Sequence, residues 1–491
     1  MAEQSVRGVA FPRTDEDGAR STTAFGRSVV QAALADVDPV GARAAEQETS
    51  WRSGYLSHFR RLVEAGIDNP DGARQSALTG VTAVVDGMRW VSPDSTERAL
   101  STLIEEPGEP QVSIGTDTVA GSGAPVNELV VPRHGEQLRG DALRRATDQW
   151  VADGVMEPSA AAAIRAVVAH PEWLALRGRT IVAMGAGAEV GPTPVLLGWG
   201  ATVAGIDLPR PEVWARVVDQ AAAGAGTLLM PVRGDSGTST ERAGLDLLTE
   251  LPEVIDWVEG LPGSLVLGSY LYADGGTNVR LSAAGDVLGA RLQRHRPDTT
   301  LAFLATPTDV FAVPREAVQA SVRAYEARSR WSKVPGRGLR AISGGRLLRR
   351  AYRPGADPGI CDALVTQQGP NYALGKRMQR WRATAERAAG RPVSMNIAPP
   401  TRTVSVVKNR ALAAAYAGAH RFGLEVFEPD TTRVLMAALL VHDLNVPPST
   451  GQEPWQEEAN QAVHGGLWRS PFAPRSALGL AALLGYGSTR S

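Results

Sequence analysis

Tyr372 and Lys376 stand four residues apart in the segment PNYALGKRMQR, and helical spacing places both side chains on one face. A phenol with a pKa of about 10 is a poor proton carrier at neutral pH, and an ammonium one turn away favours the phenolate and lowers that pKa. The same spacing often joins a half-buried ring to a solvated charge. Here, however, the chain has only three lysines, Lys333, Lys376 and Lys408, because arginine supplies the other positive charges. We therefore predict that Tyr372 gives or takes a proton at a substrate oxygen and that Lys376 assists it.

A glycine-rich segment, MGAGAEVGP, carries Gly185, Gly187 and Gly191 in the spacing GxGxxxG. Glycines between a strand and a helix let the backbone approach a dinucleotide pyrophosphate and offer it free N–H groups. Ordinary turns also show this pattern, but Asp207 follows 22 residues after Gly185, where a carboxylate accepts hydrogen bonds from ribose hydroxyls. An acid there repels a 2′-phosphate and favours NAD over NADP. Arg210, three residues further on, would serve a 2′-phosphate if its side chain turned inward.

These residues require a fold that brings the ends of several strands together. From residue 179 onward short apolar runs alternate with helical spacing, and the runs expected to be strands are RTIVAM, ATVAGID, TLLMPV, SLVLGSYL, TTLAFLAT and PVSMNIA. Strands that alternate with helices form parallel sheets connected by right-handed crossovers. We predict an α/β fold with a doubly wound parallel sheet of the Rossmann type over residues 176–475, with an insertion at about 310–365 beside the site.

The part of the chain before this sheet has a different pattern. Residues 1–25 are polar, and we expect them to be disordered. Residues 26–175 are expected to form a mainly helical domain, as in FGRSVVQAALADV and YLSHFRRLVEAGI, with a Pro, Gly and Ser-rich loop or linker at 105–127. Residues 476–491 are expected to be a C-terminal tail.

The order of these motifs resembles the short-chain dehydrogenase/reductase superfamily, in which a Gly-rich turn, an acid and YxxxK precede a strand that ends in Asn and a proline-containing turn. Here Asn396 opens the segment NIAPPTRT, 20 residues after Lys376. The resemblance implies that Tyr372 is the catalytic acid/base, that Lys376 also binds the nicotinamide ribose, and that Ile397 touches the carboxamide. The cofactor-binding residues that we predict are Gly185, Gly187, Gly191, Asp207, Arg210, Val232, Lys376, Ile397 and Thr401.

The catalytic serine of that superfamily has no direct counterpart in this chain. If TTLAFLAT is the corresponding strand, Thr306 or Thr308 donates the hydrogen bond to the substrate oxygen, and we place Thr306 among the catalytic residues. If CDALVTQQ is that strand, the donor is Thr366 or Gln367. The missing serine also leaves enoyl reduction open as an alternative reaction, in which the tyrosine stabilises an enolate oxygen.

Other polar groups have weaker claims to a role in chemistry. Tyr270 and Tyr272 stand at the end of an expected strand, where they reach a substrate or, more commonly, pack in the core. The arginines of residues 337–350 would grip a carboxylate or phosphate if they were not simply solvated. The seven histidines show no metal-binding spacing, and we expect no metal site.

The composition limits the class of protein. The 51 basic and 52 acidic residues give a net charge of −1, which argues against nucleic acid and anionic membranes as partners. The single cysteine, Cys361, excludes an intramolecular disulfide, and no apolar run reaches the length of a membrane span. We expect a soluble, cytoplasmic NAD(P)-dependent oxidoreductase that acts on a small molecule. A homo-oligomer, a redox-neutral NAD-dependent epimerase or lyase, and a non-catalytic dinucleotide-binding sensor or scaffold stay open.

Overall fold

A seven-stranded sheet in the order β14-β11-β10-β7-β8-β9-β4 forms the centre of the structure, a computed structural model that describes residues 7–14, 18–328, 343–448 and 451–486. The parallel strands are β7 (Arg179–Met184), β8 (Thr202–Ile206), β9 (Thr227–Val232), β10 (Ser264–Ser269), β11 (Thr300–Ala305) and β14 (Val393–Ile397). In chain order these strands lie 3-2-1-4-5-6, which is the order of the Rossmann fold. The predicted doubly wound α/β class is confirmed.

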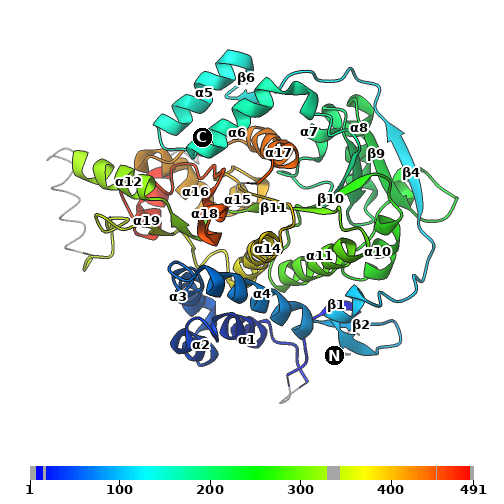
Figure 1. Cartoon of the computed structure of the whole chain (residues 1–491), viewed down its shortest axis with the longest axis horizontal. Helices are drawn as coiled ribbons and strands as arrows, with labels where there is room; N and C mark the ends of the chain where they lie inside the picture. The colour runs from blue at the N-terminus through cyan, green and yellow to red at the C-terminus, as the bar shows by residue number, and fades with distance from the viewer. Residues whose placement is uncertain (1–6, 15–17, 329–342, 449–450, 487–491) are drawn as a thin grey trace.

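Helices cover both faces of this sheet, as Figure 1 shows. Ile181 and Ala183 of β7 belong to one hydrophobic cluster, whereas Val182 and Met184 belong to another, because alternate side chains of a strand point to opposite faces. The first cluster includes helices α6 (Pro158–Ala169), α7 (Thr193–Gly198), α8 (Pro211–Ala223) and α17 (Pro429–Asn445). The second includes α10 (Leu251–Glu259), α11 (Gly276–His295) and α14 (Pro370–Ala388). Burial on both faces explains why the strands are apolar throughout.

The helical spacing between residues 26 and 100 corresponds to four helices: α1 (Thr22–Leu34), α2 (Pro39–Glu46), α3 (Trp51–Glu64) and α4 (Pro70–Gly87). They lie beneath α11 and α14 in Figure 1 and share the second hydrophobic cluster with the sheet. The contact between α4 and α14 is close, since a Cβ atom on Gly80 would lie 2.6 Å from the ring of Trp381. This part of the chain therefore supports α14, the helix that carries Tyr372 and Lys376.

Several short strands lie where the sequence predicts none, and two of them fall in segments expected to be disordered or a linker. β1 (Gly8–Ala10) lies in the segment expected to be disordered, yet it is buried and pairs with β2 (Arg89–Val91). β4 (Gly115–Ala120) lies in the expected linker and pairs with β9 as the antiparallel edge of the main sheet. An edge strand has one partner and much exposed surface, so GTDTVA lacks the continuous apolar run that marks the inner strands.

The expected insertion between β11 and α14 contains β12 (Val310–Val313), α12 (Arg315–Ala327) and β13 (Gly359–Asp362). β12 and β13 form a separate antiparallel pair. The expected C-terminal tail instead contributes to a helix, α19 (Pro474–Gly485), which packs closely on α16 (Arg410–Gly418). The other elements are β3 (Glu97–Ala99), η1 (Leu100–Ile104), β5 (Val131–Arg133), β6 (Glu136–Leu138), α5 (Gly140–Ala152), η2 (Pro171–Trp173), α9 (Ser239–Arg242), α15 (Val404–Lys408), η3 (Ala419–Phe422) and α18 (Pro454–Ala459). Within the described ranges, no helix has both the length and the hydropathy of a membrane span.

Candidate functional site

The glycine-rich turn leaves β7 at the carboxyl edge of the sheet and leads into α7. Gly185 has a φ of +86°, and a Cβ atom there would lie 3.1 Å from the carbonyl oxygen of Tyr270. The N–H groups of Gly185 and Ala186 both donate to the carbonyl of Ile206, at 2.8 and 3.1 Å. A side chain at position 185 would therefore strain the backbone and crowd β10. At Gly191 a Cβ atom would lie 3.2 Å from the Ala188 carbonyl oxygen, so this end of the turn is also tight.

Asp207, directly after β8, supports the same turn. Its Oδ2 accepts a hydrogen bond from the N–H of Gly187 and its Oδ1 one from the N–H of Leu208, both at 2.8 Å. Each carboxylate oxygen keeps further acceptor capacity, which a ribose hydroxyl can use. A Cβ atom on Gly187 would lie 2.7 Å from Cγ1 of Val213, so only glycine fits between this carboxylate and α8.

Two arginines follow Asp207 on or next to α8, and sequence reasoning found one of them, Arg210. Arg210 is exposed at the N-terminus of α8. Arg216, two turns into α8, donates from Nη2 to the Gly187 carbonyl at 3.0 Å and is also exposed. The sequence offered one signal for Arg216: it lies on the helix that follows Asp207, one turn after Val213. Whether either arginine serves a 2′-phosphate stays a prediction.

Glu189 connects the glycine-rich turn to the C-terminal part of the chain. Its carboxylate accepts from the N–H of Val404, the first residue of α15, with distances of 3.2 Å to Oε1 and 3.0 Å to Oε2. Its carbonyl accepts from Nε and Nη2 of Arg433 on α17, at 3.1 and 2.6 Å. No described residue accepts from the N–H groups of Glu189 and Val190. These N–H groups are therefore free to bind a phosphate at the turn.

Tyr372 lies in the first turn of α14, where it meets Thr306 at the end of β11. A hydrogen bond from Thr306 lowers the pKa of the Tyr372 phenol, but burial outweighs it and raises that pKa well above the usual value. The ring of Tyr272 packs edge to face on that of Tyr372, with centroids 6.0 Å apart. The structure thus brings Tyr372, Thr306 and Tyr272 together, whereas Tyr270 is buried in the core beneath β10.

Thr306 belongs to a chain of polar side chains that includes its alternative, Thr308. The two hydroxyls lie 2.9 Å apart, and Nε2 of Gln368 donates to Thr308 Oγ1 at 2.8 Å. Thr366 and Gln367, the candidates from the other strand, are exposed and bond to each other at 3.3 Å. The sequence analysis did not identify Gln368. The only indication in the sequence was that Gln368 follows the candidate Gln367 just before α14.

Lys376 turns towards the sheet. Its Nζ donates to the carbonyl of Leu304 at 3.0 Å and to Oε1 of Gln379 at 3.3 Å, while Gln379 Nε2 donates to Ser269 Oγ at 3.1 Å. Burial lowers the pKa of Lys376 to about 8. The expected lowering of the Tyr372 pKa is not found, because the ammonium faces the ends of β10 and β11 and burial dominates at the phenol. Gln379 was missed, although it follows Lys376 by one helical turn.

The remaining predicted cofactor residues are held inside the protein. Ile397 is fully buried in a hydrophobic cluster with Phe311 and Trp468. The hydroxyl of Thr401 donates to the Pro399 carbonyl at 2.9 Å and lies 2.7 Å from that of Thr432. The contacts of Ile397 and Thr401 with a cofactor stay predictions.

Val232 and Asn396 also lie at strand ends. Val232 is 5% exposed and pairs with Gly115 of the edge strand. Asn396 donates from Nδ2 to Asp443 Oδ2 at 2.9 Å, and no described residue bonds to its buried Oδ1. Asn396 Oδ1 is therefore an unused hydrogen-bond acceptor at the end of β14, at the same edge of the sheet as the glycine-rich turn.

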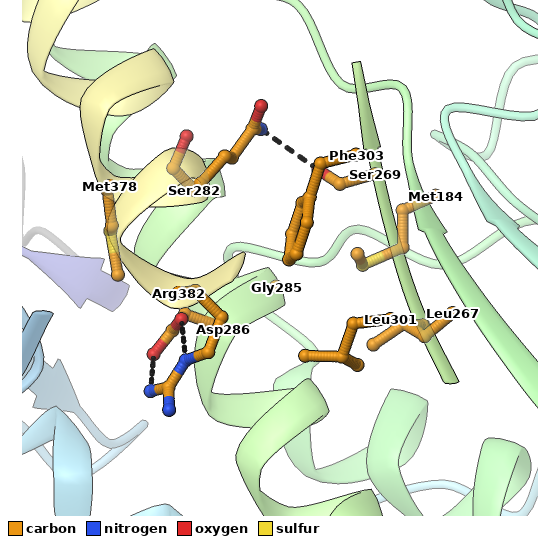
Figure 2. A pocket seen from close by; sticks show the side chains of 11 residues that line it. Met184, Leu267, Ser269, Ser282, Gly285, Asp286, Leu301, Phe303, Met378 and Arg382 are labelled. Atoms are coloured by element: carbon orange, nitrogen blue, oxygen red, sulfur yellow. Dashed lines mark hydrogen bonds and ion pairs between the residues drawn. The ribbon is translucent and has the colours of Figure 1, made fainter. Parts of the chain in front are cut away.

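Figure 2 shows a small cavity between the sheet and helices α11 and α14, lined in part by Gln379. Ser269 and Phe303 line it from the strands, and Asp286 and Arg382 form a two-pronged ion pair at 2.7 and 2.6 Å on the helix side. Its volume of about 10 Å³ suits a single water. The cavity is therefore a packing space behind Gln379 and not a substrate pocket. Among the described residues, no group of three or more His, Cys, Asp and Glu side chains is placed to hold a metal ion.

Comparison with known proteins adds little to this geometry. No protein-family model and no curated protein matches the chain. One similar solved structure is that of a thiolation-reductase di-domain from an archaeal non-ribosomal peptide synthetase, with 11% sequence identity and a TM-score of 0.26. The match covers 45% of this chain and 53% of that one, so the chain spans about half the length of the structure it matches. A likeness this distant assigns neither a family nor an activity.

Proposed function

We propose that this protein is an NAD(P)-dependent oxidoreductase of the short-chain dehydrogenase/reductase type that reduces a carbonyl group on a small molecule. The observation that carries the proposal is the contact between Tyr372 and Thr306 at the carboxyl edge of a Rossmann sheet. The glycine-rich turn and Asp207 follow other strands at this same edge. In open α/β sheets ligands bind in the crevice beyond that edge.

The residues of the turn fit a dinucleotide. Free N–H groups at Glu189 and Val190 suit the pyrophosphate, and the Asp207 carboxylate suits the adenosine ribose. A bound nicotinamide dinucleotide would supply the hydride that reaches the substrate carbon. Asp207 favours NAD, and Arg210 and Arg216 keep NADP as the alternative.

The raised pKa of Tyr372 determines its role in this proposal. Because burial keeps the phenol protonated at neutral pH, Tyr372 donates a proton to the substrate oxygen, which favours the reductive direction. Thr306 donates a second hydrogen bond to that oxygen and orients it. Lys376 has three N–H donors, of which Leu304 and Gln379 take two, so the third is left for a ribose hydroxyl of the cofactor.

Titration of the protein with NADH and with NADPH, followed by nicotinamide fluorescence, tests the cofactor. We expect NADH to bind and Asp207→Ala to weaken it by about tenfold or more, since a carboxylate hydrogen bond is worth roughly 1.5–3 kcal/mol. Asp219→Ala, which removes an exposed acid of α8, is the matched control and should leave the affinity unchanged. If neither NADH nor NADPH binds, the proposal is refuted.

A panel of aldehydes, ketones and enones, with NADH consumption as the readout, tests the reaction. Oxidation of NADH by aldehydes or ketones is the expected result. Consumption with enones alone would indicate enoyl reduction instead. Binding without consumption of NADH across the panel would indicate a sensor or scaffold, and tightly retained NAD in the purified protein would indicate an epimerase or lyase.

A further inference from the structure

The segment between β11 and α14 ends in a tight turn, residues 365–368, that contacts the end of β11. The N–H of Gln368 donates to the Val365 carbonyl at 3.1 Å, and the hydroxyl of the fully buried Tyr55 on α3 donates to the same carbonyl at 2.9 Å. The N-terminal helices therefore hold this turn in place. Of the arginine-rich stretch 337–350, which the sequence marks in the same segment, residues 337–342 lie outside the described residues.

The amide of Gln368 can take only one orientation in this turn. Its Oε1 accepts from the N–H of Val365 at 3.2 Å, and its Nε2 donates to Thr308 Oγ1 at 2.8 Å. A backbone N–H can only donate, so the end of the amide beside Val365 must be the oxygen. The NH₂ end then faces Thr308. The hydrogen bond between the two side chains therefore has one direction, with Thr308 as the acceptor.

This direction continues through the two threonines to Tyr372. Thr308 Oγ1 lies 2.9 Å from Thr306 Oγ1, and because Thr308 accepts from Gln368, its own hydrogen is the one that goes to Thr306. Thr306 Oγ1 also accepts from the N–H of Thr308 at 3.4 Å, so both of its lone pairs are used. The single hydrogen of Thr306 is left to point into the crevice, where it bonds to Tyr372.

The opposite direction would end at the wrong group. If Tyr372 donated to Thr306 and Thr306 to Thr308, the hydrogen of Thr308 would need an acceptor on Gln368. The side-chain oxygen of Gln368 is held by Val365 instead. The Tyr372 oxygen is therefore an acceptor in this hydrogen-bond chain, and its own hydrogen stays available for a substrate.

We propose that Gln368 is a positioning residue for the reduction, which sets the direction of the hydrogen-bond chain through Thr308 so that the hydrogen of Thr306 points to the reacting oxygen. This inference rests on the proposed function, in which Tyr372 and Thr306 both donate to that oxygen. In the free protein Thr306 donates to Tyr372, and a bound carbonyl oxygen beside both groups takes over the same hydrogen. Donors that are oriented in advance stabilise the negative charge that develops there without reorganisation.

Gln368→Glu reverses the end of the hydrogen-bond chain with almost no change in size. A carboxylate still accepts from Val365, but it accepts from Thr308 instead of donating to it. The hydrogen of Thr306 is then drawn to Thr308 and away from the crevice. We expect kcat at saturating NADH to fall by about 10², as for the loss of one donor to a developing oxyanion, with the KM of the carbonyl substrate within about twofold.

Gln367→Glu is the matched control, because it adds the same charge to the same turn on an exposed side chain that bonds to Thr366 and not to Thr308. It should keep the wild-type kcat. Fluorescence titration of both variants with NADH shows whether the crevice still binds the cofactor. If Gln368→Glu does not fold, Gln368→Met, which removes both polar ends of the side chain, should lower kcat in the same sense.

Variants of Thr308 test the route of the effect. Thr308→Val interrupts the hydrogen-bond chain and should lower kcat about as much as Gln368→Glu, and Thr308→Ser, which restores the hydroxyl, should recover most of that loss. The double variant of Gln368→Glu and Thr308→Val should lose no more than either single variant, because both break the same chain. A purely structural effect at Gln368 would instead add to that of Thr308→Val.

Two outcomes would overturn the role of Gln368: an unchanged kcat in Gln368→Glu, or losses that add in the double variant. A wild type that consumes no NADH with any aldehyde or ketone is a different result. It would refute the proposed function, and the role of Gln368 would fall with it.

Discussion

The ammonium nitrogen of Lys376 lies 3.0 Å from the carbonyl oxygen of Leu304, at the end of β11. This hydrogen bond ties the first turns of α14 to the sheet and directs the ammonium towards the strand ends. Tyr372, one turn earlier, contacts Thr306 instead. The two residues of YxxxK therefore contact different partners. The Tyr372 phenol meets the Thr306 hydroxyl, and the Lys376 ammonium bonds to the carbonyl of Leu304 in β11, the strand that Thr306 follows.

Tyr372→Phe removes the proposed proton donor and keeps the ring that packs on Tyr272. We expect kcat to fall by about 10² to 10⁴, since general acid catalysis contributes that much, with the NADH dissociation constant unchanged. Tyr272→Phe, which loses only the hydroxyl that donates to Asp274, is the matched control and should keep kcat within about twofold. Full turnover by the Tyr372→Phe variant would remove Tyr372 from the mechanism.

Gly187→Ala should disturb the glycine-rich turn, because the added Cβ would meet Val213 Cγ1 at 2.7 Å and Arg216 Nη2 at 2.9 Å. We expect a stability loss of about 1–3 kcal/mol from overpacking and a weaker NADH affinity, measured by chemical denaturation and fluorescence titration. Gly198→Ala on α7 has open space around its Cβ and should change neither quantity by more than about 1 kcal/mol. Equal behaviour of the two variants would contradict the close packing at Gly187.

The buried ammonium of Lys376 makes stability depend on alkaline pH. Its pKa is lowered to about 8 in the folded state against 10.5 as the ordinary value, so between these pH values the unfolded chain binds more protons. The free energy of unfolding of the wild type should therefore rise with pH in that window, relative to Lys376→Met, by about 3 kcal/mol in total. Below pH 8 the lysine is protonated in both the folded and the unfolded state, so the difference in stability between the wild type and Lys376→Met no longer changes with pH.

The measurement is denaturant unfolding of the wild type and the variant at several pH values between 8 and 10.5. Lys408→Met, which removes an exposed lysine of α15, is the control and should show a flat difference from the wild type. A flat difference for Lys376→Met as well would show that its ammonium is solvated and not held at Leu304.

Asp309→Asn should destabilise the fold strongly. Asp309 is 1% exposed and bonds to Arg377 at 3.2 Å and to Arg380 at 2.7 Å, so the change leaves two buried guanidinium groups with less negative charge. We expect a loss of about 3–5 kcal/mol in the free energy of unfolding. Asp71→Asn, which breaks an exposed pair with Arg74, should cost at most about 1 kcal/mol.

Asp309 also lies next to Thr308, and its Oδ1 accepts from the N–H of Val310. The segment that carries the Thr306 hydroxyl is therefore fixed by this ion pair network. Folded Asp309→Asn protein should show a lower kcat at low temperature than the wild type. An unchanged kcat together with an unchanged stability would contradict the role of Asp309 in holding this segment.

The sequence by itself determined the alternation of strands and helices from Arg179 onward. A parallel sheet covered on both faces needs contiguous apolar runs, and these are visible without any knowledge of tertiary contacts. The turn at Gly185 and the acid at Asp207 were identified for the same reason, since their positions follow from the ends of two such strands. Local pattern failed at β4, where an exposed edge strand carries no such run.

Only the tertiary structure decided which partners the polar side chains meet. Helical spacing places Tyr372 and Lys376 on one face, but the bond to Leu304 depends on how α14 is packed against β11. The turn that carries Gln368 is held by Tyr55, 310 positions from Val365, and the Gln368 amide meets Thr308, 60 positions away. Hydrogen bonds, burial and pKa shifts are set by such long-range neighbours, and no local periodicity records them.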